Sequence, residues 1–162
     1  MVRRTLVFLG ALLLVACPGL TWQGAVVEVR DARTLVIEHQ DQSRTVSLYG
    51  IDCPKPSQPY GQQAVDLVSS LVLDREVTVT VHRQLSSRTL AEVTPLETKD
   101  SVNALLLENG LGWVHQAYCE KAELCGRWES IEGSARSAGE GFWPEIPENM
   151  PAWRWFKEEG MP

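Results

Sequence analysis

The segment GAVVEVRDARTLVIEHQDQSRTVSLY, residues 24–49, decides the fold of this chain. It contains three short runs of apolar and β-branched residues, and the interruptions between them are polar. Such runs, bounded by turn-forming residues, are typical of β-strands. We therefore predict strands at 24–30, 34–38 and 44–49, joined by a turn at Asp31-Ala32-Arg33 and a hairpin tip at 40–43.

Beyond residue 49 the periodicity of the chain changes twice. Gly50 and three prolines interrupt regular structure, and apolar residues then recur at helical spacing from Tyr60 to Leu73. Alternating segments follow at 76–82 and 89–94. Five strands this short cannot bury both faces of an open sheet, so we expect a closed barrel with a helical cover. The other expected elements are a helix capped by Asp100 or Ser101 and ending at Asn109-Gly110, an extended segment at 111–115, a helix at 121–138, and a Pro- and Trp-rich tail beyond Gly141.

The first 16 residues have the composition of an export signal. Arg3 and Arg4 precede an apolar run that ends at Ala16 and is too short to span a bilayer comfortably. Leu14-Val15-Ala16-Cys17 resembles the lipobox of bacterial lipoproteins, in which the cysteine thiol carries a diacylglycerol. Ordinary secretion, with cleavage a few residues later, is the alternative. We expect an exported protein of the bacterial cell envelope, periplasmic or anchored to the membrane through Cys17, or else a secreted one.

The mature chain is strongly acidic. Removal of Arg3 and Arg4 with the signal leaves 13 basic and 21 acidic residues, a formal charge of −8. Because such a surface repels phosphates, general electrostatic binding of DNA or RNA is not expected. Any site for an anion has to be local.

Three cysteines remain once Cys17 is assigned to a lipid. Cys119 and Cys125 flank a short polar stretch and can form a disulfide outside the cytoplasm. Cys53 is then unpaired, or it pairs with one of these two. A zinc site is a weaker alternative, because the chain has no C-x-x-C pair and its histidines, which we expect on the surface or in strands, are scattered at His39, His82 and His115.

Six motifs occur in a fixed order along the chain. They are residues 27–35, Leu48-Tyr49-Gly50-Ile51-Asp52-Cys53-Pro54, Gln58-Pro59-Tyr60-Gly61, Arg88-Thr89-Leu90-Ala91, Val102-Asn103 with Asn109-Gly110-Leu111, and Gly141-Phe142-Trp143 with Trp153-Arg154-Trp155. In this order they resemble the thermonuclease family, the staphylococcal-nuclease-like proteins. The resemblance implies one α+β domain at 22–156, mainly β, built as a five-stranded OB-type Greek-key barrel covered by about three helices and including the Trp-rich tail.

The resemblance also implies five functional positions. In that family two aspartates hold Ca²⁺, a glutamate acts on the attacking water, and two arginines stabilise charge on the phosphate. This chain retains the second aspartate as Asp52 and the second arginine as Arg88. It has Arg33 at the first metal-binding position, Ser47 at the first arginine and Lys55 at the glutamate.

These substitutions reverse the charge of the implied site. The family set sums to −1, whereas Arg33, Ser47, Asp52, Lys55 and Arg88 sum to +2. A positive side chain about 4 Å from Ca²⁺ opposes the ion by several kcal/mol at an effective dielectric constant of about 20. Ca²⁺ also prefers several carboxylate oxygens, and one carboxylate remains at these positions.

We therefore interpret the chain as a non-catalytic binding or scaffold module, a monomer without a cofactor. Arg33, Lys55 and Arg88 are expected to form a basic pocket for a phosphate-like anion or for an anionic group of a protein partner. A Ca²⁺-dependent nuclease acting on DNA or RNA is the alternative. An envelope lipoprotein with a purely structural role is a third interpretation.

Purely structural roles are also predicted for several of these residues. Asp31 and Asp52 can serve only to bind nearby backbone N–H groups in turns, and Arg88 can pair with an acidic neighbour on the surface. Tyr118 is the one aromatic residue left near the positions where the family seats a base. Trp113, Trp128 and Trp143 are expected in the core, and Trp22, Trp153 and Trp155 are expected to clamp the termini against the barrel.

Overall fold

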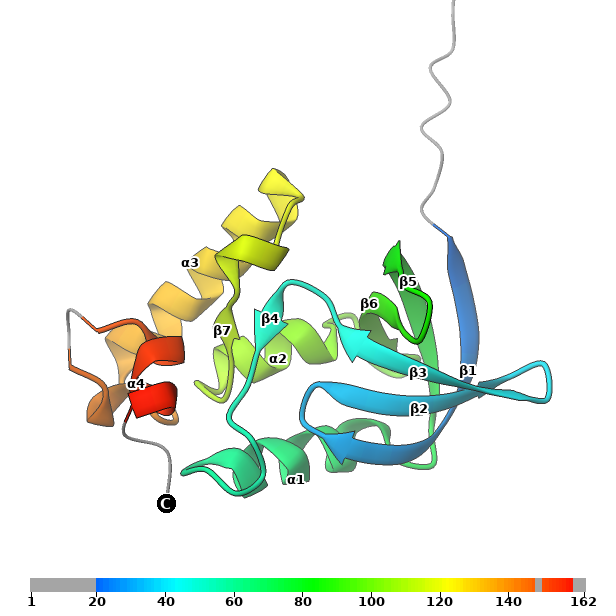
Figure 1. Cartoon of the computed structure of the whole chain (residues 1–162), viewed down its shortest axis with the longest axis horizontal. Helices are drawn as coiled ribbons and strands as arrows, with labels where there is room; N and C mark the ends of the chain where they lie inside the picture. Colours follow the sequence, from blue (N-terminus) through cyan, green and yellow to red (C-terminus); the bar gives the residue numbers. More distant parts are fainter. Residues whose placement is uncertain (1–19, 148–149, 159–162) are drawn as a thin grey trace, which may run out of the picture.

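Five strands close into a barrel in the order β1-β2-β3-β6-β5 (Figure 1). A computed structural model describes residues 20–147 and 150–158 of the chain. All neighbouring pairs are antiparallel except β3 and β6, which run parallel. The predicted fold class and all five predicted strands are confirmed. The strands are β1 (Thr21–Asp31), β2 (Thr34–His39), β3 (Gln42–Leu48), β5 (Glu76–Gln84) and β6 (Thr89–Pro95).

The first strand bends enough to pair with two partners. Its N-terminal half pairs with β5 and its C-terminal half with β2, with register shifts between Val26 and Glu28 and between Val29 and Asp31. Such irregularities increase the bend of a strand and help a sheet to close. Gly24 lies where the backbones approach, because a Cβ there would stand 2.3 Å from the carbonyl oxygen of Glu38.

Three predicted helices cover the barrel. These are α1 (Gly61–Val72), α2 (Val102–Glu108) and α3 (Ala122–Ala138). Ser101, rather than Asp100, caps α2, because its hydroxyl accepts the N–H of Ala104 at 3.3 Å. In Figure 1 these helices gather on one side of the barrel, and the β2–β3 hairpin points away from them.

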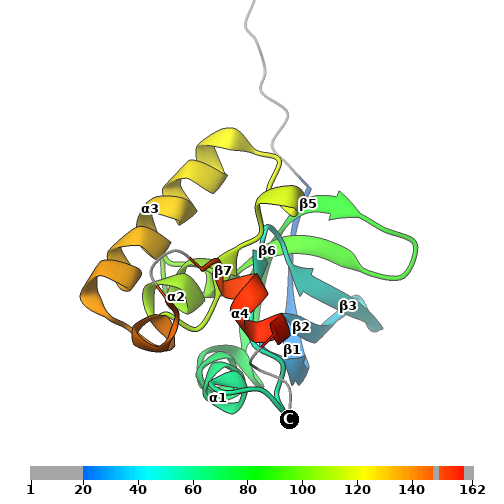
Figure 2. The ribbon, with the colours of Figure 1, turned by 60° about the vertical axis from the view of Figure 1, so that its left-hand side comes forward.

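Several short elements complete the fold, and one of them was predicted. The strand β7 (Trp113–Val114) lies within the predicted extended segment 111–115 and pairs with β4 (Ile51–Asp52), which was not predicted. Two short 3-10 helices follow, η1 (Gln116–Tyr118) and η2 (Trp143–Glu145), and the tail ends in α4 (Ala152–Glu158). Figure 2 shows α4, in red, beside β7.

The tail builds a second apolar cluster instead of clamping the chain against the barrel. Trp155 and Phe156 pack with Trp113 and Phe142, separately from the barrel core. The expected clamp is therefore wrong for Trp155, and Trp153 is 53% exposed. Trp22 does pack against the barrel core. The prediction that Trp113, Trp128 and Trp143 are core residues is confirmed.

Cys119 and Cys125 form a disulfide, as predicted, and Cys53 is a free, buried thiol. The export signal at 1–16 and Cys17 lie outside the described residues. Among the described helices, none combines the length and the apolarity needed to cross a bilayer.

Candidate functional site

A cavity of about 400 Å³ lies where the β1–β2 turn, the loop after β4, and α4 meet. Its volume is in the range of small-molecule sites. The charged side chains that line it are Asp31, Arg33, Asp52, Lys55 and Lys157, and the aromatic ones are Trp113, Trp153 and Phe156.

An ion pair between Arg33 and Asp52 lies at this cavity. Nη1 of Arg33 is 3.3 Å from Oδ1 of Asp52, and the two side chains are 30% and 33% exposed. Partial burial reduces the screening of their charges by water and salt. Arg33 therefore places a fixed positive charge against the carboxylate that the family resemblance assigns to a metal.

Both aspartates of the cavity also bind backbone. Asp31 Oδ1 accepts the N–H of Arg33 at 2.8 Å, which fixes the β1–β2 turn. Asp52 Oδ1 accepts the N–H of Cys53 at 2.9 Å. The predicted turn role of these carboxylates is confirmed, and Asp52 has one oxygen shared between a backbone N–H and a guanidinium.

The loop that carries Lys55 is tied to α4. The backbone N–H of Lys55 donates to Gln58 Oε1 at 2.7 Å, and Gln58 Nε2 donates to the carbonyl of Phe156 at 2.7 Å. Gly61 packs so closely against this loop that a Cβ there would lie 1.8 Å from the Lys55 carbonyl oxygen. Lys55 itself is exposed. Across the described ranges, no carboxylate is paired with the ammonium of Lys55 or Lys157.

The other two predicted positions lie apart from the cavity. Ser47 is 1% exposed in β3, where it pairs with Leu90. Its hydroxyl has no hydrogen-bond partner within the described part of the chain. Arg88 is exposed in the β5–β6 turn and is not among the cavity-lining residues. The structure thus brings Arg33 and Lys55 of the expected basic pocket to one cavity and leaves Arg88 outside it.

Three lining residues of α4 were missed by the sequence analysis. Trp153, Phe156 and Lys157 stand at positions i, i+3 and i+4 of one helix, so they share a face. This spacing is the signal that the sequence offered in a tail for which no helix was predicted. Lys157 replaces Arg88 as the third cation of the cavity.

Ca²⁺ does not fit this set of residues. Hard cations such as Ca²⁺ take six to eight oxygen ligands. Here Asp52 is already paired with a guanidinium, and Lys55 and Lys157 add two further cations. In residues 20–147 and 150–158, no three His, Cys, Asp or Glu side chains are grouped so that they could hold a metal ion.

Cys53 also lines the cavity. Burial, with a further contribution from the charge of Asp52, raises the pKa of the Cys53 thiol. The group therefore remains a neutral thiol at ordinary pH, which makes it a weak nucleophile.

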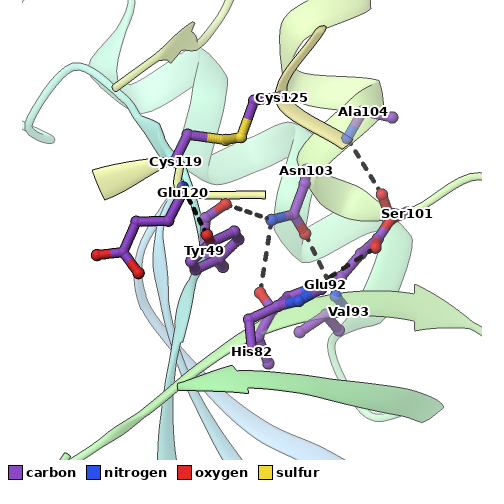
Figure 3. Close-up of polar contacts among 11 residues, drawn as sticks. Tyr49, His82, Glu92, Val93, Ser101, Asn103, Ala104, Cys119, Glu120 and Cys125 are labelled. Carbon is purple, nitrogen blue, oxygen red and sulfur yellow. Dashed lines mark hydrogen bonds and ion pairs between the residues drawn. A yellow bond between two sulfur atoms is a disulfide. The ribbon is translucent and has the colours of Figure 1, made fainter. Parts of the chain in front are cut away.

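A polar network around Asn103 and Tyr49 lies next to the Cys119–Cys125 disulfide (Figure 3). Asn103 Oδ1 accepts the N–H of Val93 at 3.2 Å, and its Nδ2 donates to the carbonyl of Tyr49 at 3.1 Å. The Tyr49 hydroxyl accepts the N–H of Glu120 at 2.8 Å, next to the disulfide. A Cβ on Gly50 would meet the Cys119 sulfur at 2.8 Å, so the disulfide packs directly on the turn that leads to Asp52.

The fold and the comparisons with known proteins agree. Residues 45–145, more than half of the chain, match the family of staphylococcal nuclease homologues, and the chain belongs to this family. It therefore carries a nuclease-like domain of the OB type.

Several proteins whose names include endonuclease or nuclease are similar to this chain over most of its length. It is 29% identical over 133 residues to an "Uncharacterized endonuclease" of Escherichia coli O157:H7, covering 82% of this chain and 83% of that protein. It is 27% identical over 142 residues to a "Micrococcal nuclease" of Shigella flexneri, covering 83% and 80%. A "Probable endonuclease lcl3" of Aspergillus niger is 29% identical over 137 residues, and the match spans 49% of that protein.

Proposed function

We propose that this protein is a metal-free anion-binding module built on a nuclease-like barrel. The observation that carries the proposal is the Arg33–Asp52 ion pair, with Nη1 and Oδ1 3.3 Å apart. It supplies from within the chain the positive charge that a metal ion would otherwise bring to Asp52. Lys55 and Lys157 then face the same cavity as surplus cations.

The charge of the cavity favours an anion. Its ionisable lining has two carboxylates and three cations, while the whole chain has a formal charge of −6. Both carboxylates accept backbone N–H groups, and one is also paired with Arg33. A small anion would find charge-assisted donors in the lysines, and the acidic surroundings would disfavour extended polyanions.

The same residues argue against hydrolysis of a phosphodiester. Lys55 stands where the family resemblance assigns the water-activating glutamate, and a protonated amine has no lone pair with which to accept a proton. Asp31 and Asp52 are held in hydrogen bonds to the backbone. The family itself and the names of its members favour the second candidate, a Ca²⁺-dependent nuclease.

Phosphate titration tests the proposal. We expect inorganic phosphate to bind wild-type protein in calorimetry at low salt without Ca²⁺. Lys55→Met should weaken binding by roughly fivefold, the upper end of what an exposed charge interaction contributes. Lys99→Met is the matched control, because Lys99 is an exposed lysine that does not line this cavity. Absence of binding at low salt would overturn the proposal.

A nuclease assay separates the two candidates. Purified protein is incubated with single-stranded and double-stranded DNA and with RNA, with added Ca²⁺ or with a chelator. We expect no cleavage in either condition. Cleavage that requires Ca²⁺ and disappears with the chelator would favour the nuclease and overturn the interpretation as a non-catalytic, metal-free module.

We further propose that the protein is exported and lipidated at Cys17, on the basis of its N-terminal sequence. Incorporation of labelled fatty acid in a bacterial host tests this step. Wild-type protein should carry the label and Cys17→Ser should lose it. Cys53→Ser is the control that should keep it. A label that persists in Cys17→Ser would contradict lipidation at this residue.

A further inference from the structure

The cavity is larger than a simple anion requires. Its volume of about 400 Å³ is in the range that accommodates a small organic molecule. The lysines account for the charged part of a ligand. The remaining lining includes three aromatic residues, which a small inorganic anion would not contact favourably. The ligand should therefore also have an apolar part.

Only one of these aromatic side chains is open to a ligand. Trp113 is 5% exposed and Phe156 3% exposed, and they stack on each other with ring centroids 5.1 Å apart. Trp153 is 53% exposed. Within the described part of the chain, no ring or cation contacts its indole. An exposed indole at a cavity offers a flat surface on which a ring can stack.

The exposed indole and a free ammonium lie next to each other. Trp153 and Lys157 are four residues apart in α4, which places them on one face of the helix. Both line the cavity that also receives Lys55. The helix is held in place because Gln58 Nε2 donates to the Phe156 carbonyl and because Trp155 and Phe156 are buried in the aromatic cluster.

We propose that the ligand is an anion carried on a planar aromatic ring, with the ring stacked on Trp153 and the anionic group held between Lys55 and Lys157. This inference rests on the proposed anion-binding function and gives the chemical class of its ligand. The helix α4 supplies both the stacking surface and one of the cations. Trp153 is thus a specificity-determining residue, and Lys157 contacts the anion.

The experiment compares two phosphate monoesters of equal charge. Methyl phosphate and phenyl phosphate are titrated separately into wild-type protein by calorimetry at low salt without metal. We expect phenyl phosphate to bind roughly tenfold tighter than methyl phosphate, the scale of one aromatic stacking contact. Trp153→Ala should remove this difference, and Trp153→Phe should keep most of it.

A matched control isolates the indole. Tyr118 is another exposed aromatic residue, 57% exposed, and it does not line the cavity. Tyr118→Ala should leave the preference for phenyl phosphate unchanged. In wild-type protein, the Trp153 indole N–H resonance, assigned with Trp153→Phe, should shift with phenyl phosphate and stay in place with methyl phosphate.

The possible outcomes separate this inference from the function on which it rests. If both esters bind equally, or if Trp153→Ala keeps the preference, the ring-stacking inference is wrong and anion binding stands. If neither ester nor inorganic phosphate binds, both fail. A nucleoside monophosphate, compared with phenyl phosphate, distinguishes a nucleobase from a smaller aryl group as the natural ring, and phenyl sulfate tests how far binding depends on the charge of the anionic group.

Discussion

Nη1 of Arg33 lies 3.3 Å from Oδ1 of Asp52, and the pair joins the β1–β2 turn to the short strand β4. A guanidinium thus neutralises a carboxylate at the mouth of a nuclease-like barrel. The positive charge belongs to the chain and cannot be removed by a chelator. This relationship leads to the first prediction.

Restoring carboxylates should allow Ca²⁺ to bind. In calorimetry, we expect wild-type protein to show no binding of Ca²⁺ at 1:1 stoichiometry. The double variant Arg33→Asp with Lys55→Glu should acquire weak Ca²⁺ binding, because three carboxylates then face the cavity besides Asp31. Arg30→Asp with Lys99→Glu changes the net charge equally at exposed positions outside the cavity. Equal Ca²⁺ binding by both double variants would show that net charge, and not the site, is responsible.

The third cation of the cavity is predicted to be Lys157 and not Arg88. Lys157→Met should weaken phosphate binding by roughly fivefold, because the lysine lines the cavity. Arg88→Met should change it little, because Arg88 lies in the β5–β6 turn outside the lining. Calorimetric titration of both variants provides the measurement. The reverse ranking would restore the site expected from the sequence.

Removal of the Asn103 side chain should destabilise the fold. Asn103 is fully buried and binds the backbone of Val93 and Tyr49. Asn103→Leu leaves these groups without partners, at a cost of about 1–3 kcal/mol in the free energy of unfolding. Urea denaturation followed by tryptophan fluorescence measures it. Asn109→Ala removes an exposed amide whose Nδ2 donates to the carbonyl of Leu105 at 2.8 Å, and should cost much less.

Reduction of the disulfide should weaken the wall behind Asp52. Replacing both cysteines, Cys119→Ser with Cys125→Ser, should lower the free energy of unfolding by about 2 kcal/mol, as expected for a short closed loop. Because Cys119 packs against Gly50, phosphate affinity should also fall. Urea denaturation and calorimetry check the two effects. Ser134→Ala with Ser137→Ala, a double substitution at exposed positions of α3 outside the cavity, leaves the disulfide intact and serves as the control. Equal losses in both proteins would contradict a specific role of the disulfide.

Glu132 should make the stability of the protein depend on pH. Burial raises the pKa of Glu132, although its Oε2 accepts the N–H of Val114 at 2.7 Å. A folded-state pKa above the unfolded value of about 4.3 favours folding below that value, and the contribution is lost as pH rises through the folded pKa. Wild-type protein should therefore lose stability over this interval relative to Glu132→Gln. Parallel urea titrations from pH 4 upward test the sign.

Much of the barrel can be predicted from the sequence because its strands have regular patterns. Alternation in 76–82 and helical spacing in 60–73 report burial on one face, and both elements are found within a few residues of the predicted ends. The two-residue strands β4 and β7 have no such pattern, because their pairing depends on a contact between distant segments. The helix α4 was not predicted for a related reason. It is only seven residues long, and packing against other segments holds it in place.

The candidate site was predictable only in part. The motif around residues 27–35 and 48–54 indicated Arg33, Asp52 and Lys55, and the three do line one cavity. Their charges predict a site without a metal, and this stays a prediction. The ion pair itself, and the arrival of Lys157 from a segment about a hundred residues further along the chain, depend on tertiary structure. No local pattern reports which distant cation completes a pocket.

The separation between barrel core and aromatic cluster has a consequence for how this protein can change over time. The strands that close the barrel bury their side chains independently of α4. The exposed face of α4, with Trp153 and Lys157, can therefore be substituted without disturbing strand pairing. A few substitutions in α4 can therefore give this scaffold new ligand preferences, while the strand pairing of the barrel is retained.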